Sequence, residues 1–231
     1  MTSLRRVAAP GFLVLLASAC LEPVPIQQDA GPIVVDSPAA VVTALERAYE
    51  KRDLALLSSV LAHDADRNAA YVFYLHGPSD ASETAWTYAE EVRIHRRMFD
   101  PTRSATGEPP VPRDLWQAGA AVSFRQITPF EERFDLYSAD AGADGKLDPA
   151  IWRVTDARYS TEGLFRMKSE NDYLIQGDAD LVVLEDLTRG AGEDGKFCLY
   201  AWEDLGVAEK PAPGPAAILE ATWSTWKRLY R

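Results

Sequence analysis

Three histidines, at positions 63, 76 and 95, are the side chains of this chain best suited to proton transfer near neutral pH. No two of them have the spacing of metal ligands on one element, so no metal site is expected. His95 lies on a helical face that is otherwise apolar and aromatic, shared with Tyr88, Val92 and Phe99. Two roles follow for His95: a hydrogen-bonded core residue, which we favour, or an acid–base group lining a pocket.

The two cysteines stand in different settings. Cys198 belongs to an apolar strand pattern, Phe-Cys-Leu-Tyr at 197–200, which is typical of a buried structural thiol rather than a nucleophile. Cys20 instead ends an apolar run, directly after Leu-Ala-Ser-Ala. The chain has no Gly-x-Ser-x-Gly elbow, phosphate loop or dinucleotide fingerprint, so no cofactor is expected.

The first twenty residues have the layout of a secretory signal. Arg5 and Arg6 precede an apolar run at 7–19, which is shorter than the roughly 20 residues of a membrane-spanning helix. The segment with Cys20 resembles the lipobox of bacterial lipoproteins. The resemblance implies a lipid on the Cys20 sulfur, removal of the signal peptide 1–19, and acylation of the new amino group by a chain such as palmitate. Because Leu21 stands where an inner-membrane retention signal has Asp, we expect an outer-membrane lipoprotein facing the periplasm.

The charge of the chain limits its partners. It carries 24 Lys and Arg against 35 Asp and Glu, a net charge of −11 that becomes −13 without the two arginines of the signal. Nucleic acid is not an expected partner, because its binding needs clustered Lys and Arg. The negative net charge also argues against electrostatic binding to anionic lipids. The lipid on Cys20 is therefore the expected contact with the membrane.

Two parts are expected after the signal. Residues 20–36 contain three prolines, one glycine and no helical stripe, and are interpreted as the lipidated cysteine and a flexible tether. Residues 37–231 have the usual size of a single domain and contain no second linker long enough to divide them.

Helices are predicted in the first part of this domain. Ser37 is expected to cap a first helix, with a proline in its first turn, and Asp53 to cap a short second one. A strand is predicted at 70–75, and a third helix at 83–99, ended by Asp-Pro.

Strands are predicted in the second part, where apolar residues alternate with polar ones. Long strands are expected at 174–184 and 197–202, and Asp-Gly pairs at 144–145 and 194–195 indicate hairpin turns. Helices followed by antiparallel strands favour an α+β fold over alternating βαβ units.

Two further patterns carry weaker signals. Residues 140–148 echo the start of an EF-hand, but Gly142 and Ile151 occupy two ligand positions, so calcium binding is not expected. Leu-Glu-Asp-Leu at 184–187 recurs as Trp-Glu-Asp-Leu at 202–205. Polar strand ends at the rim of a sheet explain this echo adequately.

The order of elements resembles the nuclear transport factor two-like superfamily, also called SnoaL-like or cystatin-like α+β. Local segments are similar too. Residues 44–54 resemble the opening helices of the superfamily. Bacterial lipoproteins placed in this group have segments similar to residues 86–99, 199–205 and 225–230. The resemblance implies a cone, with N-terminal helices packed in a strongly curved antiparallel sheet and a cavity at the open end. It points to a set of cavity-lining residues in this chain: Tyr71, Phe73, Tyr88, His95, Trp152 and Trp202.

Three hypotheses about function follow, because a fold of this kind does not determine an activity. The leading one is a lipid-anchored, non-catalytic domain of the cell envelope that binds a small apolar ligand or a partner. The second is a hydro-lyase or isomerase, for which His95 and Asp64 are the acid–base candidates that the resemblance suggests. The third is an assembly protein whose sheet pairs with a second copy as a homodimer.

Overall fold

The computed structural model describes residues 33–75, 84–99, 120–137, 146–166, 172–206 and 218–231. The described residues belong to one compact unit, Ile33–Arg231. Ile33 and Val35 already pack against its hydrophobic core, ahead of the domain start expected at Ser37. The signal, Cys20 and the greater part of the expected tether lie outside the described residues.

Helices α1 (Pro38–Lys51) and α2 (Leu54–Val60) begin where their caps predict. Ser37 accepts a hydrogen bond from the amide of Ala40, and Asp53 accepts one from the amide of Leu56. Between them the chain turns through Arg52, whose φ of 54° lies in the left-handed region that ends many helices. Local sequence signals therefore place both helices correctly.

Helix α3 (Tyr88–Phe99) begins later than the prediction of 83–99. The preceding residues form strand β4 (Ala85–Thr87), which pairs antiparallel with β3 (Val72–Tyr74). Thr87 and Glu90 then start the helix, since the Glu90 side chain accepts from the Thr87 amide and the Thr87 hydroxyl accepts from the Glu90 amide. The predicted helix start was wrong because the pairing of Trp86 with Phe73 in the sheet overrides its helical pattern.

The large sheet has the strand order β4-β3-β9-β8-β7-β5 in the described residues, with β6 and β10 as additional strands. The remaining bounds are β5 Ala120–Gln126, β6 Glu131–Glu132, β7 Trp152–Phe165, β8 Asp172–Asp186, β9 Phe197–Gly206 and β10 Ile218–Ala221. Most pairs are antiparallel as expected, but β3 pairs parallel with β9 and β10 pairs parallel with β8, so the sheet is mixed. The hairpin predicted at 194–195 is confirmed, because Gly195 turns at φ 74° between β8 and β9.

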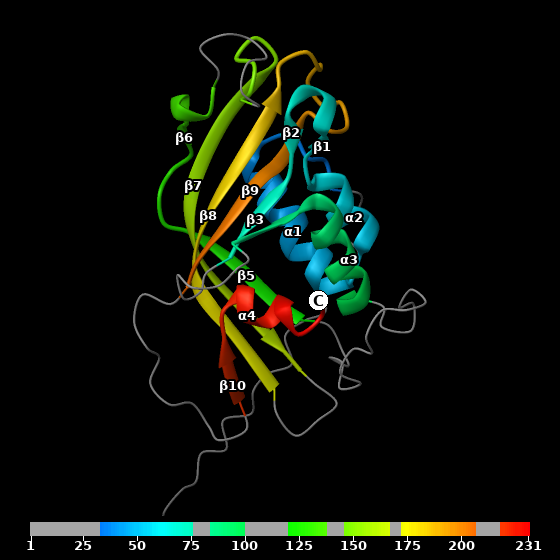
Figure 1. Ribbon diagram of the computed structural model, residues 1–231, viewed down its shortest axis with the longest axis vertical. Coiled ribbons are helices and arrows are strands. Elements are labelled where there is room, and N and C mark those ends of the chain that lie inside the picture. The colour runs from blue at the N-terminus through cyan, green and yellow to red at the C-terminus, as the bar shows by residue number, and fades with distance from the viewer. Residues whose placement is uncertain (1–32, 76–83, 100–119, 138–145, 167–171, 207–217) are drawn as a thin grey trace, which may run out of the picture. The chain divides into compact units, whose positions relative to one another are not determined.

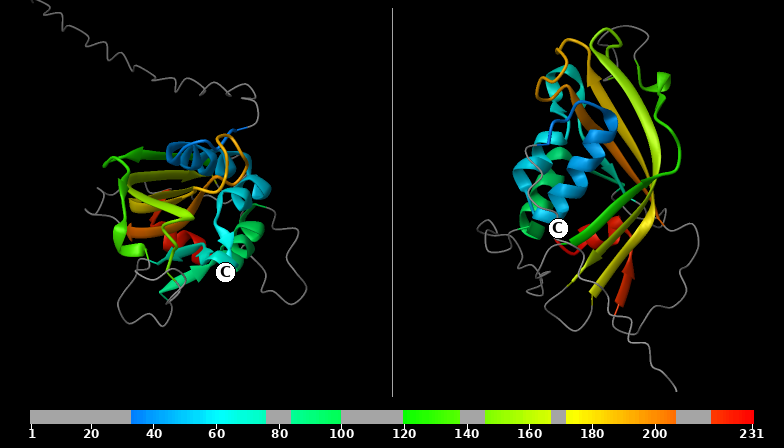
Figure 2. Two further views of the ribbon diagram at one scale, coloured as in Figure 1. Left: turned by 90° about the horizontal axis from the view of Figure 1, so that it is seen from above. Right: turned by 180° about the vertical axis from the view of Figure 1, so that it is seen from behind.

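The sheet is strongly curved, and α1, α2 and α3 cover its concave face (Figures 1 and 2). Two register shifts interrupt the β8–β9 pairing, between Asp178 and Ala179 and between Val182 and Val183. Such irregularities bend a strand and increase its twist. The fold class is therefore α+β, with helices in a curved open sheet, as predicted.

Two small features close the ends of the helical layer. Strands β1 (His63–Asp64) and β2 (Ala69–Ala70) form a separate two-stranded sheet near the β8–β9 turn, at the top of Figure 1. Helix α4 (Trp223–Arg228) lies toward the other end. No helix in the described part of the chain has both the length and the apolar character needed to cross a bilayer.

Candidate functional site

The space between helices and sheet is filled largely by aromatic side chains. The largest fully buried ones are Trp86, Trp202, Trp223, Trp226, Tyr49, Tyr71, Tyr230, Phe73 and Phe165. Four of the residues expected to line a cavity lie in this packed interior: Tyr71, Phe73, His95 and Trp202. Tyr88 is partly buried at the start of α3, its ring 5.6 Å from that of His63 between centroids.

His95 is fully buried, as its helical face predicts. Its Nδ1 lies 2.9 Å from the carbonyl oxygen of Glu91, so Nδ1 carries the proton and donates. Its Nε2, 2.6 Å away from the Tyr49 hydroxyl, then accepts from that hydroxyl. Burial lowers the pKa of His95 to about 4, with Lys227 adding to the effect and Glu91 opposing it. The imidazole is therefore neutral at neutral pH.

Lys227 of α4 reaches the same interior region. Its Nζ lies 2.5 Å from Oε1 of Glu91, and it stands 3.6 Å above the ring centroid of Phe73 and 4.2 Å from that of Trp202. The hydroxyl of Tyr71 also donates to Glu91. Burial lowers the pKa of Lys227, although Glu91 opposes this change. These groups are out of reach of a substrate in this structure, because the Glu91, His95 and Lys227 side chains are at most 2% exposed.

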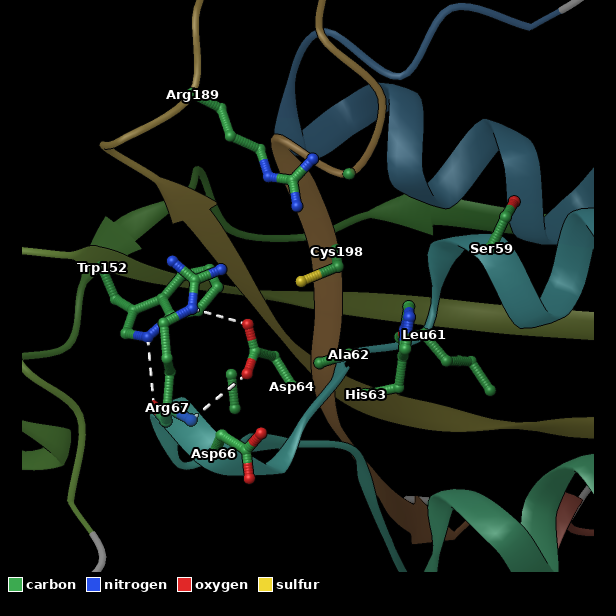
Figure 3. Close-up of a pocket in the computed structure, with 12 residues that line it drawn as sticks. Ser59, Leu61, Ala62, His63, Asp64, Asp66, Arg67, Trp152, Arg189 and Cys198 are labelled. Atoms are coloured by element: carbon green, nitrogen blue, oxygen red, sulfur yellow. Dashed lines mark hydrogen bonds and ion pairs between the residues drawn. The ribbon is translucent and has the colours of Figure 1, made fainter.

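An open pocket lies at the other end of the helical layer, by β1 and β2 (Figure 3). Its volume is about 300 Å³, at the small end of the range for ligand sites. It is lined by Ser59, Leu61, Ala62, His63, Asp64, Asp66, Arg67, Ala69, Trp152, Arg189, Gly195 and Cys198. These residues come from the end of α2, the β1–β2 segment, the start of β7 and the β8–β9 hairpin.

Asp186, buried behind the pocket, joins its two arginines. One carboxylate oxygen, Oδ2, accepts from Nη2 of Arg67 at 2.9 Å and from Nε of Arg189 at 3.1 Å. The other oxygen accepts from the amide and the hydroxyl of Thr188. Burial raises the pKa of Asp186, but the hydrogen bonds from Thr188, Arg67 and Arg189 outweigh it and bring the pKa to about 2. The carboxylate is thus a permanent anchor for both guanidinium groups.

Two further contacts fix Arg67. Its Nε donates to Asp64 at 2.6 Å, and its guanidinium carbon lies 4.6 Å from the ring centroid of Trp152. The indole nitrogen of Trp152 in turn donates to the Arg67 carbonyl. Asp64 therefore holds an arginine in place, and Trp152 is the one member of the expected cavity-lining set that lines this pocket.

Cys198 lines the pocket but does not have the character of a nucleophile. Burial, with a contribution from the nearby Asp186 carboxylate, raises the pKa of its thiol to about 12. A thiol with this pKa is protonated at neutral pH, whereas nucleophilic attack needs the thiolate. The sequence prediction of a buried structural cysteine is confirmed.

The structure brings together several residues that the sequence reasoning did not select. Arg67 and Arg189 line the pocket, Asp186 joins them from behind it, and Lys227 completes the interior ion pair. The one available signal was the echo at 184–187 and 202–205, because both of its aspartates are buried anchors. Asp186 binds the arginines, and Asp204 accepts from the amide and hydroxyl of Ser224 at the start of α4.

Residues 140–148, where calcium binding is not expected, and the hairpin turn predicted at 144–145 lie largely outside the described residues. Within the described ranges, no group of three or more His, Cys, Asp or Glu side chains is placed to hold a metal ion.

Comparison with known proteins finds similar solved structures at low identity. No protein-family model matches the chain, and no curated protein matches it. Among similar solved structures are an NTF2-like protein of unknown function in nutrient uptake from Rhodospirillum rubrum (15% identity, 74% of this chain, 99% of that chain, TM-score 0.37) and a protein of the NTF2-like family from Streptomyces avermitilis (11% identity, 74% and 94%, TM-score 0.39). A third is the beta subunit of benzoate 1,2-dioxygenase from Burkholderia mallei (12% identity, 76% and 91%, TM-score 0.40). These identities and TM-scores assign neither a family nor a function to this chain.

Proposed function

We propose that this protein is a lipid-anchored, non-catalytic binding domain of the cell envelope. Its ligand is a small molecule that occupies the pocket beside β1 and β2 rather than the interior of the cone. The observation that carries the proposal is the contrast between the two regions. The interior is filled by buried aromatic side chains, whereas the pocket is open and holds two arginines in fixed positions.

Binding is favoured over catalysis by the state of three titratable groups at or directly behind the pocket. Cys198 is a protonated thiol, Asp186 is held ionised by three residues, and Asp64 is engaged with Arg67. His95, the acid–base candidate of the enzyme hypothesis, is sealed in the interior. A hydro-lyase or isomerase would need the side chains packed around His95, among them Tyr49 and Phe99, to move before substrate could reach it.

The anchoring part of the proposal rests on the signal and the lipobox. Cys20→Ala is expected to abolish attachment of lipid and to leave the protein soluble or unprocessed. Metabolic labelling with a radioactive fatty acid, followed by immunoprecipitation, measures this directly. Label retained by the Cys20→Ala protein would refute lipid attachment at this cysteine.

The binding part can be tested by filling the pocket. Native mass spectrometry of protein purified from its source would reveal a retained small molecule. Ala62, which lies inside the pocket in Figure 3 and whose backbone is fixed by hydrogen bonds with Leu199 and Tyr71, offers a blocking site. Ala62→Leu is expected to release the retained molecule while its thermal unfolding remains cooperative. A folded Ala62→Leu protein that still carries the molecule would show that the ligand binds elsewhere.

A further inference from the structure

We propose that Arg67 and Arg189 form an oxyanion subsite, so that the ligand of the pocket carries a carboxylate or a phosphate group. This inference rests on the binding function proposed above and names the chemical class of the ligand. It follows from how the two guanidinium groups are held, which donors they have left, and what surrounds them.

The two guanidinium groups are brought together by one carboxylate oxygen. Nη2 of Arg67 and Nε of Arg189 lie 2.9 and 3.1 Å from Oδ2 of Asp186, so these two nitrogens are no more than 6.0 Å apart. The anchor is rigid because Asp186 is 1% exposed and is bound on its other oxygen by Thr188. Two cations that would otherwise repel each other are thereby held side by side.

Each arginine is also fixed on a second side. Arg67 is bound by Asp64 and lies over the ring of Trp152. Arg189 donates from Nη1 to the carbonyl oxygen of Asp194 at 2.6 Å. Little side-chain entropy then remains to be lost when a ligand binds, and such preorganisation favours affinity.

Donors remain on both arginines after these bonds are counted. Within the described part of the chain, Nη1 of Arg67 and Nη2 of Arg189 have no hydrogen-bond partner. Figure 3 shows the Arg189 side chain extending over the pocket above Cys198, with Arg67 at the adjacent wall. Guanidinium donors are matched to the oxygens of carboxylate and phosphate groups, which they bind through short charge-assisted hydrogen bonds.

The rest of the lining sets the size and character of the ligand. The apolar part of the lining is Leu61, Ala62 and Ala69, each at most 2% exposed, with the protonated thiol of Cys198, and it lies beside the exposed polar residues Ser59, His63 and Asp66. A volume of about 300 Å³ admits an oxyanion with a compact apolar body and excludes a large lipid.

Acidic neighbours limit the affinity for an anion. Asp64 and Asp186 together balance the charges of Arg67 and Arg189, and Asp66 is exposed at the pocket and makes no ion pair among the described residues. Removing its charge in Asp66→Asn is expected to tighten binding of an oxyanion about two- to fivefold, because the repulsion is screened by solvent.

The test is an NMR titration of the full-length, isotopically labelled protein with three probes. Phenylacetate carries a carboxylate on a compact apolar body, phenylacetamide is its neutral counterpart, and inorganic phosphate carries the anion alone. Phenylacetate or phosphate is expected to shift the resonances of pocket residues. Phenylacetamide is expected to bind at least about tenfold more weakly than phenylacetate, because it lacks the charge-assisted hydrogen bonds.

Arg189→Gln is the decisive variant, and Arg158→Gln is its matched control. Both arginines lie on the surface, 43% and 46% exposed, and each is paired with an aspartate, Asp186 and Asp180 respectively. Arg189→Gln is expected to weaken oxyanion binding at least about tenfold, whereas Arg158→Gln leaves it unchanged.

The outcomes separate this inference from the proposed function. Loss of phenylacetate binding in Ala62→Leu but not in Arg189→Gln would keep the pocket and overturn the subsite. Equal binding of phenylacetate and phenylacetamide would also overturn it. If phosphate binds and phenylacetate does not, and if Arg189→Gln removes the binding of phosphate, the subsite is supported and the group it binds is a phosphate. If neither anion binds, the subsite is refuted, whatever molecule mass spectrometry finds in the pocket.

Discussion

Removal of the positive charge from Lys227 tests how the interior is held together. In Lys227→Met the new side chain keeps most of the unbranched stem but loses the ammonium that meets Glu91 at 2.5 Å. The side chains of Lys227 and Glu91 are at most 2% exposed, so bulk water does not replace the lost partner. Breaking a buried pair by removing one partner costs about 3–5 kcal/mol, since a charge is left alone in the interior. We expect the free energy of unfolding to fall by this amount.

Removing both charges should cost much less. Burial lowers the pKa of Lys227 despite the nearby Glu91, and Oε2 of Glu91 has no hydrogen-bond partner among the described residues. The pair therefore does not fully recover the free energy lost by taking two charges out of water. Glu91→Met combined with Lys227→Met is expected to be more stable than Lys227→Met alone and within about 1 kcal/mol of the parent.

Urea unfolding followed by tryptophan fluorescence and by far-UV circular dichroism measures these free energies, provided that the two transitions coincide. Lys196→Met is the control, because Lys196 pairs with Glu185 at 3.5 Å where both side chains are partly exposed. Its expected cost is below about 1 kcal/mol. The reasoning is refuted if Lys227→Met costs no more than Lys196→Met, or if the double variant is less stable than Lys227→Met.

Two further predictions concern His95 and a close backbone approach. The pKa of His95 is about 4 in the folded protein and 6.5 in the unfolded chain, so its contribution to stability is complete above pH 6.5 and is lost as the pH falls through 4. The free energy of unfolding should fall by about 3 kcal/mol over this range. Chemical unfolding at several pH values measures this loss, which the non-titrating His95→Gln should not show. A Cβ added at Gly177 would lie 2.6 Å from the carbonyl oxygen of Gly206, so Gly177→Ala is expected to lower the free energy of unfolding by about 1–3 kcal/mol. Gly190→Ala, which meets only the flexible end of Glu193, should change it by less than about 0.5 kcal/mol, and equal effects of the two substitutions would contradict this account.

Elements with local signals could be predicted from the sequence. The caps of α1 and α2 act over three residues, so Ser37 and Asp53 identify both helix starts. The apolar patterns likewise identified two long strands, because the predicted ranges 174–184 and 197–202 lie within β8 and β9. Where a distant strand competed, the local pattern failed, and Trp86 joined the sheet instead of α3.

The pocket and the interior ion pair could not be predicted because their partners are far apart in the chain. Arg67 and Asp186 are separated by 119 residues, and Glu91 and Lys227 by 136. A lysine between Trp226 and Arg228 has the pattern of a surface residue until the fold places it over Phe73 and Trp202. Spacing within one element carries no information about such pairs.

The position of α4 has a consequence for how the chain folds. Trp223, Trp226 and Lys227 complete the core, yet they contact Tyr49 of α1 and Glu91 of α3, which belong to segments made much earlier. Contacts across such long sequence separations slow folding, because the entropy of closing the loop is lost before the contacts form. Until α4 docks, the aromatic faces of β3 and β9 remain open to solvent, and an intermediate of this kind is prone to self-association. We therefore expect the docking of α4 to be a late, rate-limiting step. Before this step, the newly made chain is most exposed to aggregation with other copies of itself.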